Sequence, residues 1–444
     1  MDVPDVRYAR SGGVAVAYRV FGDGPEWLVF APHLTNLFVL LQRRDVREFV
    51  ARLGAGAGVV VFDPRGTGLS DRPRHVTLEA RMDDITALLD ANGIERATLF
   101  GVATSASVCA LFAATYPERC RSLAVVDLFP QGVSTDDYPY GVSEEQWLSG
   151  IRSHRERWGD RDYLEGFARG TDPQAAAIDE QLDARVWELR LAVAPADAAE
   201  FARMGMESDI TDVLGAIRVP TLVLHRSDPL VVFPPDERGL ARFVAERIRD
   251  VRVVELARGS LYSDETAERV LELVRGDSPV TVPDSVLATV LFTDLVGSSE
   301  RAAALGDRGW RDLLARHHAD VRRELTRYRG EEVDSAGDGF FCRFDGPARA
   351  MACARAIVDG AKELDLDVRT GIHTGECELV GPKIAGIAVV TGARISSLAA
   401  PGEVLVSRTV RDLVAGSGFS FVDRGEHELT GVPGRWRLYA VVDA

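Results

Sequence analysis

Apolar and polar positions in the first 275 residues alternate between strand-like runs and segments with helical spacing. Six short apolar runs are expected strands: Trp27–Phe30, Val59–Phe62, Ala97–Phe100, Leu123–Val126, Thr221–Leu224 and Val251–Leu256. Strands separated by helices form mainly parallel sheets covered on both faces. The pattern therefore predicts an α/β domain over residues 1–275. The stretch between the fourth and fifth runs is too long for a loop, and we expect a helical cap over about residues 128–218.

The pattern changes after residue 275. Residues 276–285 are rich in Pro, Gly and Asp without periodicity, which is typical of a linker. Residues 286–444 then mix short strands and helices, which predicts a separate α+β domain. The expected elements are strand Leu287–Thr293, helix Trp310–Tyr328, a hairpin of Glu332–Ser335 and Gly339–Phe344, helix Pro347–Leu364, strand Val368–His373, helix Ile387–Leu398 and three further short strands.

Composition narrows the setting in which the chain works. With 46% apolar and 27% charged residues it has the balance of a soluble protein. Met1 to Arg10 carries charges where a signal peptide needs an apolar core, and no long apolar run is present, so we expect a cytoplasmic protein without membrane contact. A net charge of −16 argues against nucleic-acid binding. The five scattered cysteines are expected to be reduced packing residues.

Three segments of the first domain resemble the α/β-hydrolase family: VVVFDPRGTGLSDRP from Val59, LFGVATSASVCALFAATYPERC from Leu99, and VPTLVLHRSDPLV from Val219. That resemblance implies a nucleophile on a tight strand-to-helix turn, with an acid and a histidine later in the chain. Ala103 stands at the nucleophile position, Asp228 at the acid position, and the expected histidine falls near Ser260. Because a methyl group cannot attack a carbonyl, we expect a degenerate triad without hydrolase chemistry.

Other polar residues near that turn allow two interpretations. Ser105 is either a displaced nucleophile or, together with Thr104, a cap of the following helix, and we favour the cap. His225 is expected to be a core histidine, and His33 to line the old pocket. That pocket either binds a small ligand that regulates the second domain or belongs to a scaffold that assists folding or dimerisation.

Two motifs of the second domain each place an aspartate next to small residues. LFTDLVGSS begins at Leu291 and contains Asp294, and SAGDGF begins at Ser335 and contains Asp338. Together with GIHTGE from Gly371 and PGEVLVS from Pro401, they resemble class III adenylate and guanylate cyclases. The resemblance implies a homodimer that converts a nucleoside triphosphate to a 3′,5′-cyclic nucleotide and pyrophosphate. It further implies two divalent ions, Mg²⁺ or Mn²⁺, because one activates the 3′-hydroxyl and the other neutralises the leaving group.

The same resemblance assigns candidate site residues. Those for the metals are Asp294, Leu295 and Asp338, and those for the phosphates are the loop amides of Val296, Gly297 and Ser298. Arg394 aligns with the arginine that stabilises charge at the α-phosphate, contributed by the other protomer. Val390 stands where the family usually has a polar, ribose-orienting residue, and Thr430 where it usually has a phosphate-binding lysine. Each lost donor could cost about a hundredfold in rate.

Two charges are reversed at the positions that read the base. Adenylate-forming relatives usually carry Lys and Asp where this chain has Asp334 and Lys383. A carboxylate accepts and an ammonium donates, so the reversed pair matches the N–H and carbonyl of guanine or uracil. We therefore expect GTP or UTP to be preferred over ATP, and relatives used in phage defence do form cyclic UMP. The alternative is an ion pair without a role in recognition.

Three functional interpretations follow. The first is an active cyclase controlled by a pseudo-hydrolase sensor domain, favoured because Asp294, Asp338 and Arg394 are intact. The second is a nucleotide-binding regulatory protein whose catalysis is impaired by Val390 and Thr430, and an ATP-using adenylate cyclase remains a variant of the first. The third, an acyl hydrolase with an accessory cyclase domain, conflicts with Ala103.

Overall fold

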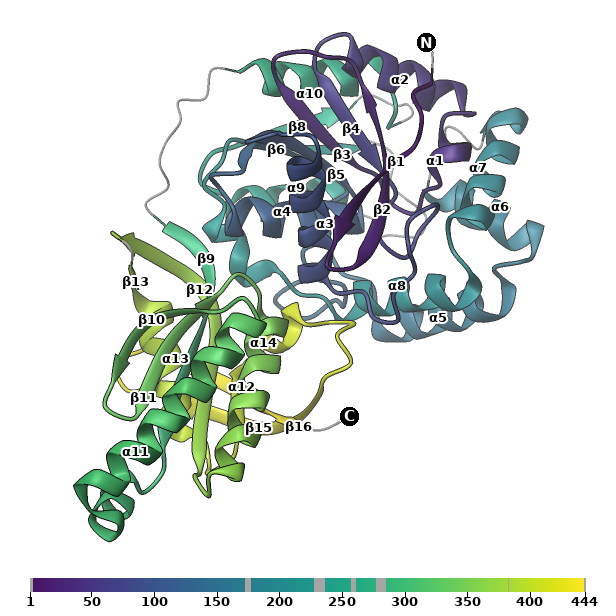
Figure 1. Ribbon diagram of the computed structural model, residues 1–444. Coiled ribbons are helices and arrows are strands. Elements are labelled where there is room, and N and C mark those ends of the chain that lie inside the picture. The colour runs from purple at the N-terminus through teal and green to yellow at the C-terminus, as the bar shows by residue number, and fades with distance from the viewer. Residues whose placement is uncertain are drawn as a thin grey trace. The chain divides into compact units, whose positions relative to one another are not determined.

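Two sheets, each of eight strands, organise the chain (Figure 1). The computed structural model describes residues 3–171, 177–226, 236–256, 261–276, 285–381 and 383–442. The chain divides into two compact units, Met1–Pro283 and Asp284–Ala444. Most of the expected linker lies outside the described residues. Asp228 and Ser260, which stand at expected triad positions of the first domain, also lie outside them.

The first sheet has the strand order β1-β2-β4-β3-β5-β6-β7-β8. Its strands are β1 (Arg7–Ser11), β2 (Val14–Phe21), β3 (Trp27–Ala31), β4 (Gly58–Phe62), β5 (Ala97–Val102), β6 (Cys120–Val126), β7 (Thr221–Arg226) and β8 (Val251–Leu256). From β4 to β8 neighbouring strands are parallel, whereas β1 and β2 pair in antiparallel fashion at one edge. The central strands are continuous apolar runs because helices cover both of their faces.

Helices pack on both faces of this sheet (Figure 1). Two of them, α2 (Arg44–Gly54) and α10 (Asp264–Arg275), share a core cluster with alternate residues of the strands. On the other face, α3 (Leu78–Ala91) packs against α4 (Thr104–Thr115), and α9 (Glu237–Ala245) contacts β7 and β8. The short α1 (Leu37–Leu40) follows β3.

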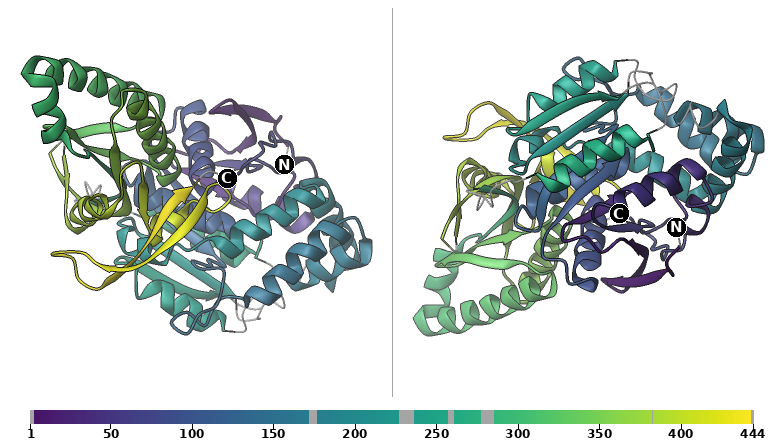
Figure 2. Two further views of the ribbon diagram at one scale, coloured as in Figure 1. Left: turned by 90° about the horizontal axis from the view of Figure 1, so that it is seen from below. Right: turned by 90° about the horizontal axis from the view of Figure 1, so that it is seen from above.

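In the described residues between β6 and β7, four helices form the cap. They are α5 (Glu144–Arg157), α6 (Arg161–Thr171), α7 (Asp179–Ala192) and α8 (Pro195–Glu207), and a 3₁₀ turn at Thr211–Ala216 leads back to the sheet. In the views of Figure 2 the cap helices lie together on one side of the first unit, with α5 packed on α8 and α6 on α7. Ser143 and Gln146 form a capping box at the start of α5, which fixes where this first cap helix begins.

The second sheet has the order β10-β11-β9-β12-β14-β16-β15, with β13 paired to β12. The strands are β9 (Ser285–Leu295), β10 (Glu331–Ala336), β11 (Gly339–Phe344), β12 (Val368–Val380), β13 (Lys383–Ala385), β14 (Val404–Ser407), β15 (Ser420–Glu428) and β16 (Arg435–Val442). Successive residues of β9 point to opposite faces, as the period of two requires. Leu291 belongs to the core on one face, and Val290 to the core on the other.

Helices α11 (Ser298–Arg327), α12 (Pro347–Glu363) and α14 (Arg408–Leu413) pack on the Leu291 face of this sheet. Helix α13 (Ile387–Leu398) packs on the Val290 face. Gly306 interrupts α11 with a positive φ of 69° and kinks it. Among the described residues of both units, no helix combines the length and the apolar character needed to cross a bilayer.

Candidate active site and ligand cavity

Asp294 and Asp338 lie at the same end of two neighbouring strands. Asp294 is the penultimate residue of β9, and Asp338 occupies the turn between β10 and β11. Strand β11 pairs with β9 so that Phe340 is opposite Thr293, and the Phe340 amide donates to Thr293 Oγ1 at 3.2 Å. This register brings the Asp338 turn to the end of β9, as the sequence motifs predict.

The two carboxylates have different surroundings. Asp338 Oδ2 is buried and has no hydrogen-bond partner among the described residues. Asp294 Oδ2 instead accepts from Arg369 on β12, whose Nε lies at 2.9 Å and whose Nη2 also donates. Both of these side chains remain about one third exposed. An unpartnered buried carboxylate oxygen is costly, so it needs a cation or a donor that the described part of the chain does not supply.

Two histidines of α11 adjoin this site. The ring of His318 stands edge-on to Phe340, with ring centroids 4.9 Å apart. Burial lowers the pKa of His317 to about 4, and burial likewise lowers that of His318, while the charge of Asp338 acts in the opposite direction on both. The His317 ring is therefore neutral at physiological pH.

The donor set suits a small divalent cation that is completed by its substrate. In the described part of the chain, no group of three or more His, Cys, Asp or Glu residues converges on one point. Mg²⁺ typically takes one or two protein carboxylates together with waters and substrate phosphates, so Asp294 and Asp338 fit it. The Leu295 side chain is 4% exposed and packs in the core, so only its main chain is suited to such a role.

The loop after β9 is less open to phosphates than we expected. Gly297 adopts the left-handed conformation, with φ of 67°, and α11 begins at Ser298. The Val296 amide already donates to the carbonyl of Asp367 at 2.8 Å. Its assignment as a phosphate donor is therefore corrected, because this amide is committed to a bond between strand ends. A phosphate-binding role of the loop would rest on Gly297 and Ser298.

A cavity of about 380 Å³ lies on the α13 side of the carboxylate end. Its described lining includes Asp294, Arg369 and Asp334, together with the stacked rings of Phe292 and Phe341, whose centroids are 4.6 Å apart. Arg369 and the aromatic pair escaped the sequence analysis, since their roles follow from pairing between strands that are distant in sequence. The available signal for Arg369 was its place in the expected strand Val368–His373, two residues before the GIHTGE motif begins.

Asp334 and Lys383 do meet, although they are far apart in sequence. Lys383 Nζ lies 3.1 Å from Asp334 Oδ2, and both side chains are more than half exposed. The hydrogen bond from Lys383, followed by its charge, holds the pKa of Asp334 below its usual range. The contact is compatible both with base recognition and with a plain ion pair.

Arg394 does not join the two aspartates within one chain. It is exposed on α13, and its Nε donates to the carbonyl of Thr430 at 3.0 Å. Val390, one helical turn earlier, is 38% exposed. Neither residue belongs to the described lining of the cavity beside Asp294.

In the first unit the strand-to-helix turn keeps the strained backbone of a nucleophile elbow. Ala103 has φ of 52° and ψ of −125°, between the end of β5 and the start of α4. A Cβ added to Gly101 would lie 2.7 Å from Ala106 Cα, so only glycine permits the close approach of strand and helix. The elbow is therefore present without a nucleophilic side chain.

The expectation that Thr104 and Ser105 cap α4 is wrong. The helix has no side-chain cap, because both hydroxyls bind elsewhere. Ser105 Oγ donates to the carbonyl of Pro32 at 2.8 Å and accepts from Arg81 at 3.0 Å, and it is 1% exposed. Thr104 Oγ1 lies 2.8 Å from His33 Nδ1. Ser105 is thus a buried structural residue and is not among the described lining residues of the large cavity next to the elbow.

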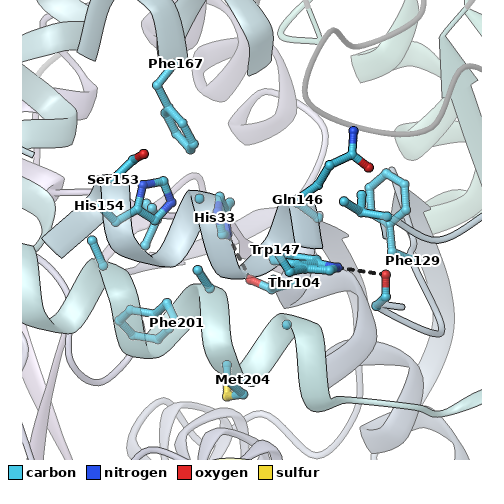
Figure 3. Close-up of a pocket in the computed structure, with 18 of the residues that line it drawn as sticks. His33, Thr104, Phe129, Gln146, Trp147, Ser153, His154, Phe167, Phe201 and Met204 are labelled. Atoms are coloured by element: carbon cyan, nitrogen blue, oxygen red, sulfur yellow. Dashed lines mark hydrogen bonds between the residues drawn. The ribbon is translucent and has the colours of Figure 1, made fainter. Parts of the chain in front are cut away.

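A cavity of about 580 Å³ lies between the elbow and the cap. Figure 3 shows His33 and Thr104 at its centre, with Phe167 and His154 on one side and Gln146 and Phe129 on the other. Ala103 lines the cavity with its methyl group, and His33 lines it as the sequence predicts. His225 is instead buried within β7, away from the described lining.

Comparison with known families assigns both units. Residues 31–237 match the α/β-hydrolase fold family, and residues 281–443 match the adenylate and guanylate cyclase catalytic domain family. The predicted fold classes and their order along the chain are confirmed. A bromoperoxidase structure from Bacillus anthracis shares the fold of the first unit. It is 18% identical, covers 61% of this chain and 100% of its own, and has a TM-score of 0.51.

Curated relatives match a smaller share of the chain. "Putative adenylate cyclase 3" of Rhizobium meliloti (strain 1021) is 28% identical over 33% of this chain and 26% of its own length. An uncharacterized protein of Mycobacterium tuberculosis (strain ATCC 25618 / H37Rv) is 34% identical over 37% of this chain and 59% of its own length. The chain thus spans less than two thirds of each of these relatives. It joins an α/β-hydrolase fold domain to a C-terminal member of the adenylate and guanylate cyclase catalytic domain family.

Proposed function

We propose that the protein is a nucleotide cyclase, which forms a 3′,5′-cyclic nucleotide and pyrophosphate from a nucleoside triphosphate. The observation that carries this proposal is the pair of carboxylates at one end of β9 and β11, with Asp338 Oδ2 buried and unpartnered. Asp294 and Asp338 would hold two divalent ions, which lower the pKa of the attacking 3′-hydroxyl and neutralise the leaving group. Arg369 would move from Asp294 toward the phosphates when the carboxylate is needed for a cation.

The site is proposed to be shared by two copies of the chain. Arg394 is not among the described lining residues of the cavity beside Asp294, and it is exposed on α13, where a second copy could use it. In a homodimer the arginine of one protomer would stabilise charge at the α-phosphate bound by the other. Before a second copy binds, the hydrogen bond from Arg394 to the Thr430 carbonyl would hold the guanidinium at the surface.

The nucleotide base is proposed to be guanine or uracil. Asp334 lines the cavity beside Asp294, and its ion pair with Lys383 is exposed. Exposed ion pairs are weak, so a bound base can replace each partner at little cost. Asp334 would then accept from a ring N–H, and Lys383 would donate to the neighbouring carbonyl.

The alternative of impaired catalysis rests on two positions. Val390 carries no polar atom for the ribose, and Thr430 cannot bind the terminal phosphates as lysine does. Against this, the charged residues expected to act in catalysis, Asp294, Asp338 and Arg394, are all retained. Among the described residues, Asp338 Oδ2 also has no hydrogen-bond partner. We therefore favour the enzyme over a non-catalytic nucleotide-binding protein.

The first unit is proposed to sense a ligand that changes the rate of the cyclase. Its cavity opens onto the elbow, where Ala103 supplies only a methyl group. Binding there can proceed without hydrolysis of the ligand, which is the property a sensor needs.

One experiment tests the catalytic proposal. The purified full-length protein is incubated with Mn²⁺ or Mg²⁺ and each of the four ribonucleoside triphosphates, and products are identified by mass. We expect a cyclic product from GTP or UTP, and none from an Asp338→Ala control. No product from any nucleotide would favour the non-catalytic protein. Turnover of ATP at least as efficient as that of GTP and UTP would overturn the base preference and leave the cyclase in place.

A further inference from the structure

The cavity above the elbow has walls that are mainly aromatic and apolar. Phe167, Phe201 and Met204 face it, as Figure 3 shows. Two aromatic residues of the lining, Trp147 and His154, already have hydrogen-bond partners. Trp147 Nε1 donates to the carbonyl of Gly132 at 2.9 Å, and His154 Nδ1 lies 2.6 Å from the Tyr163 hydroxyl. The Trp147 indole therefore offers a ligand its ring surface, because its single N–H is already used.

The polar pair next to the elbow, His33 and Thr104, lies at the centre of the cavity. One hydrogen bond joins His33 Nδ1 and Thr104 Oγ1, and either the ring N–H or the hydroxyl can be its donor. If the hydroxyl donates, His33 Nε2 carries the other proton and is a donor, and the threonine oxygen keeps a lone pair. If the ring donates, the roles are exchanged. In either arrangement the pair presents one donor and one acceptor, which suits a hydroxyl, amide or carbonyl group.

The interior of the cavity is unsuited to a charged group. Burial is the main reason that the pKa of His33 falls to about 3 and that of His154 to about 4, so both rings stay neutral. Among the described lining residues, full charges belong to Arg157 and Asp162, and both are exposed to solvent. Burying a ligand charge against these walls would carry the desolvation penalty without a partner.

We propose that this cavity binds a neutral, largely aromatic molecule of roughly twenty non-hydrogen atoms, anchored by one uncharged polar group at His33 and Thr104. The size follows from a volume of about 580 Å³, which lies within the range of small-molecule sites. The identity of the ligand class deepens the proposal that the first unit is a sensor, and it rests on that unit binding a ligand at all. The ligand would dissociate from the cavity without being hydrolysed, because the methyl group of Ala103 cannot attack it.

A matched pair of fluorescent probes tests this inference on the full-length protein. N-phenyl-1-naphthylamine is neutral and aromatic, and 8-anilino-1-naphthalenesulfonate has the same skeleton with an added sulfonate. We expect one molecule of the neutral probe to bind per chain, at least about tenfold more tightly than the sulfonate. Its affinity should stay constant between about pH 5.5 and 8, because His33 does not titrate there. Equal or tighter binding of the sulfonate would overturn the inference.

Variants of the cap and of the anchor locate the binding site. Ala202 lines the cavity from α8, so Ala202→Trp should reduce affinity for the neutral probe at least tenfold. Ala196→Trp places the same side chain on the exposed face of that helix and should leave affinity unchanged. If Ala202→Trp fails to fold, Gly150→Leu on α5 serves instead, since a Cβ there meets no atom within 4 Å. His33→Phe should weaken binding about fivefold by removing the polar pair.

These outcomes separate the inference from the proposed function. Unchanged binding in a folded cavity variant would show that the probe sits elsewhere and would overturn the inference. Binding that behaves as expected while cyclic nucleotide production stays constant at saturating probe would retain the inference and count against the sensor role. Loss of cyclase activity in every assay would leave the binding measurements intact.

Discussion

A buried ion cluster holds the cap against the sheet domain. Glu188 on α7 is 1% exposed, and its Oε2 lies 2.8 Å from Arg185 Nη1 and 3.6 Å from Arg43 Nη1. Thr35 donates to its Oε1 at 3.3 Å. Arg43 is also 1% exposed and has a second partner in Asp45, at 2.7 Å. The cluster therefore joins a cap helix to the segment that leads from β3 into α2.

Glu188→Ala removes the carboxylate that two arginines share. Removing one partner of a buried ion pair costs about 3–5 kcal/mol, because the remaining charge is left uncompensated. Arg43 keeps Asp45, so the unpaired charge falls mainly on Arg185, which is 12% exposed. The loss should therefore be near the lower end, about 3 kcal/mol. For a unit of this size that corresponds to a fall in Tm of roughly 6–12 °C.

Chemical and thermal unfolding of the full-length protein measure this loss, followed by fluorescence. Glu200→Ala is the matched control, since the Arg155–Glu200 pair of the same cap is about 60% exposed on both sides. Exposed pairs contribute at most about 1 kcal/mol, so this control should unfold almost like the wild type. Equal destabilisation by Glu188→Ala and Glu200→Ala would refute the view that the buried cluster anchors the cap.

Three further changes test the remaining proposals. Asp338→Ala and Arg394→Ala should each be inactive. A mixture of the two variant proteins should regain activity, because one site of each heterodimer keeps both residues. No recovery from folded, dimeric variants would contradict a shared site. Asp334→Lys combined with Lys383→Asp should shift the ratio of kcat/KM values toward ATP by about tenfold, and an unchanged ratio would mark the pair as structural. Ala103→Ser should hydrolyse nitrophenyl esters no faster than the wild type, since the sequence lacks the histidine that serves as base; measurable turnover would reveal another base.

Much of the fold follows from local pattern. All six runs expected in the first domain are strands. Five are buried, as is typical of parallel strands that are covered on both faces, whereas β8 at the edge of the sheet is mostly exposed or half-buried. The hairpin of Arg7–Ser11 and Val14–Phe21 was missed, since it mixes charged and apolar residues at the edge of the sheet. Helix α11 begins at Ser298, whereas the sequence predicted a start at Trp310. The first part of the helix was missed because Gly306 interrupts the apolar periodicity.

The candidate site is only partly visible in the sequence. Motif spacing identified Asp294 and Asp338, whose positions depend on short local turns. Arg369 was missed because it reaches Asp294 through the pairing of β12 with β9. Asp334 and Lys383 were linked by the chemistry of their reversed charges, and the fold brings them into contact. Contacts between distant strands are what local reasoning cannot supply.

The elbow explains how a hydrolase frame can lose its chemistry and keep its cavity. A positive φ at Ala103 costs about 1–3 kcal/mol, yet the strain does not come from a nucleophile. It comes from the approach of α4 to β5, where a Cβ on Gly101 would lie 2.9 Å from the carbonyl oxygen of Ser105. The Ser105 side chain is in turn held by two hydrogen bonds, one from Arg81 and one to the carbonyl of Pro32. Because backbone packing sets the turn, replacing the nucleophile with a methyl group removes the reaction and leaves the shape of the site for a ligand.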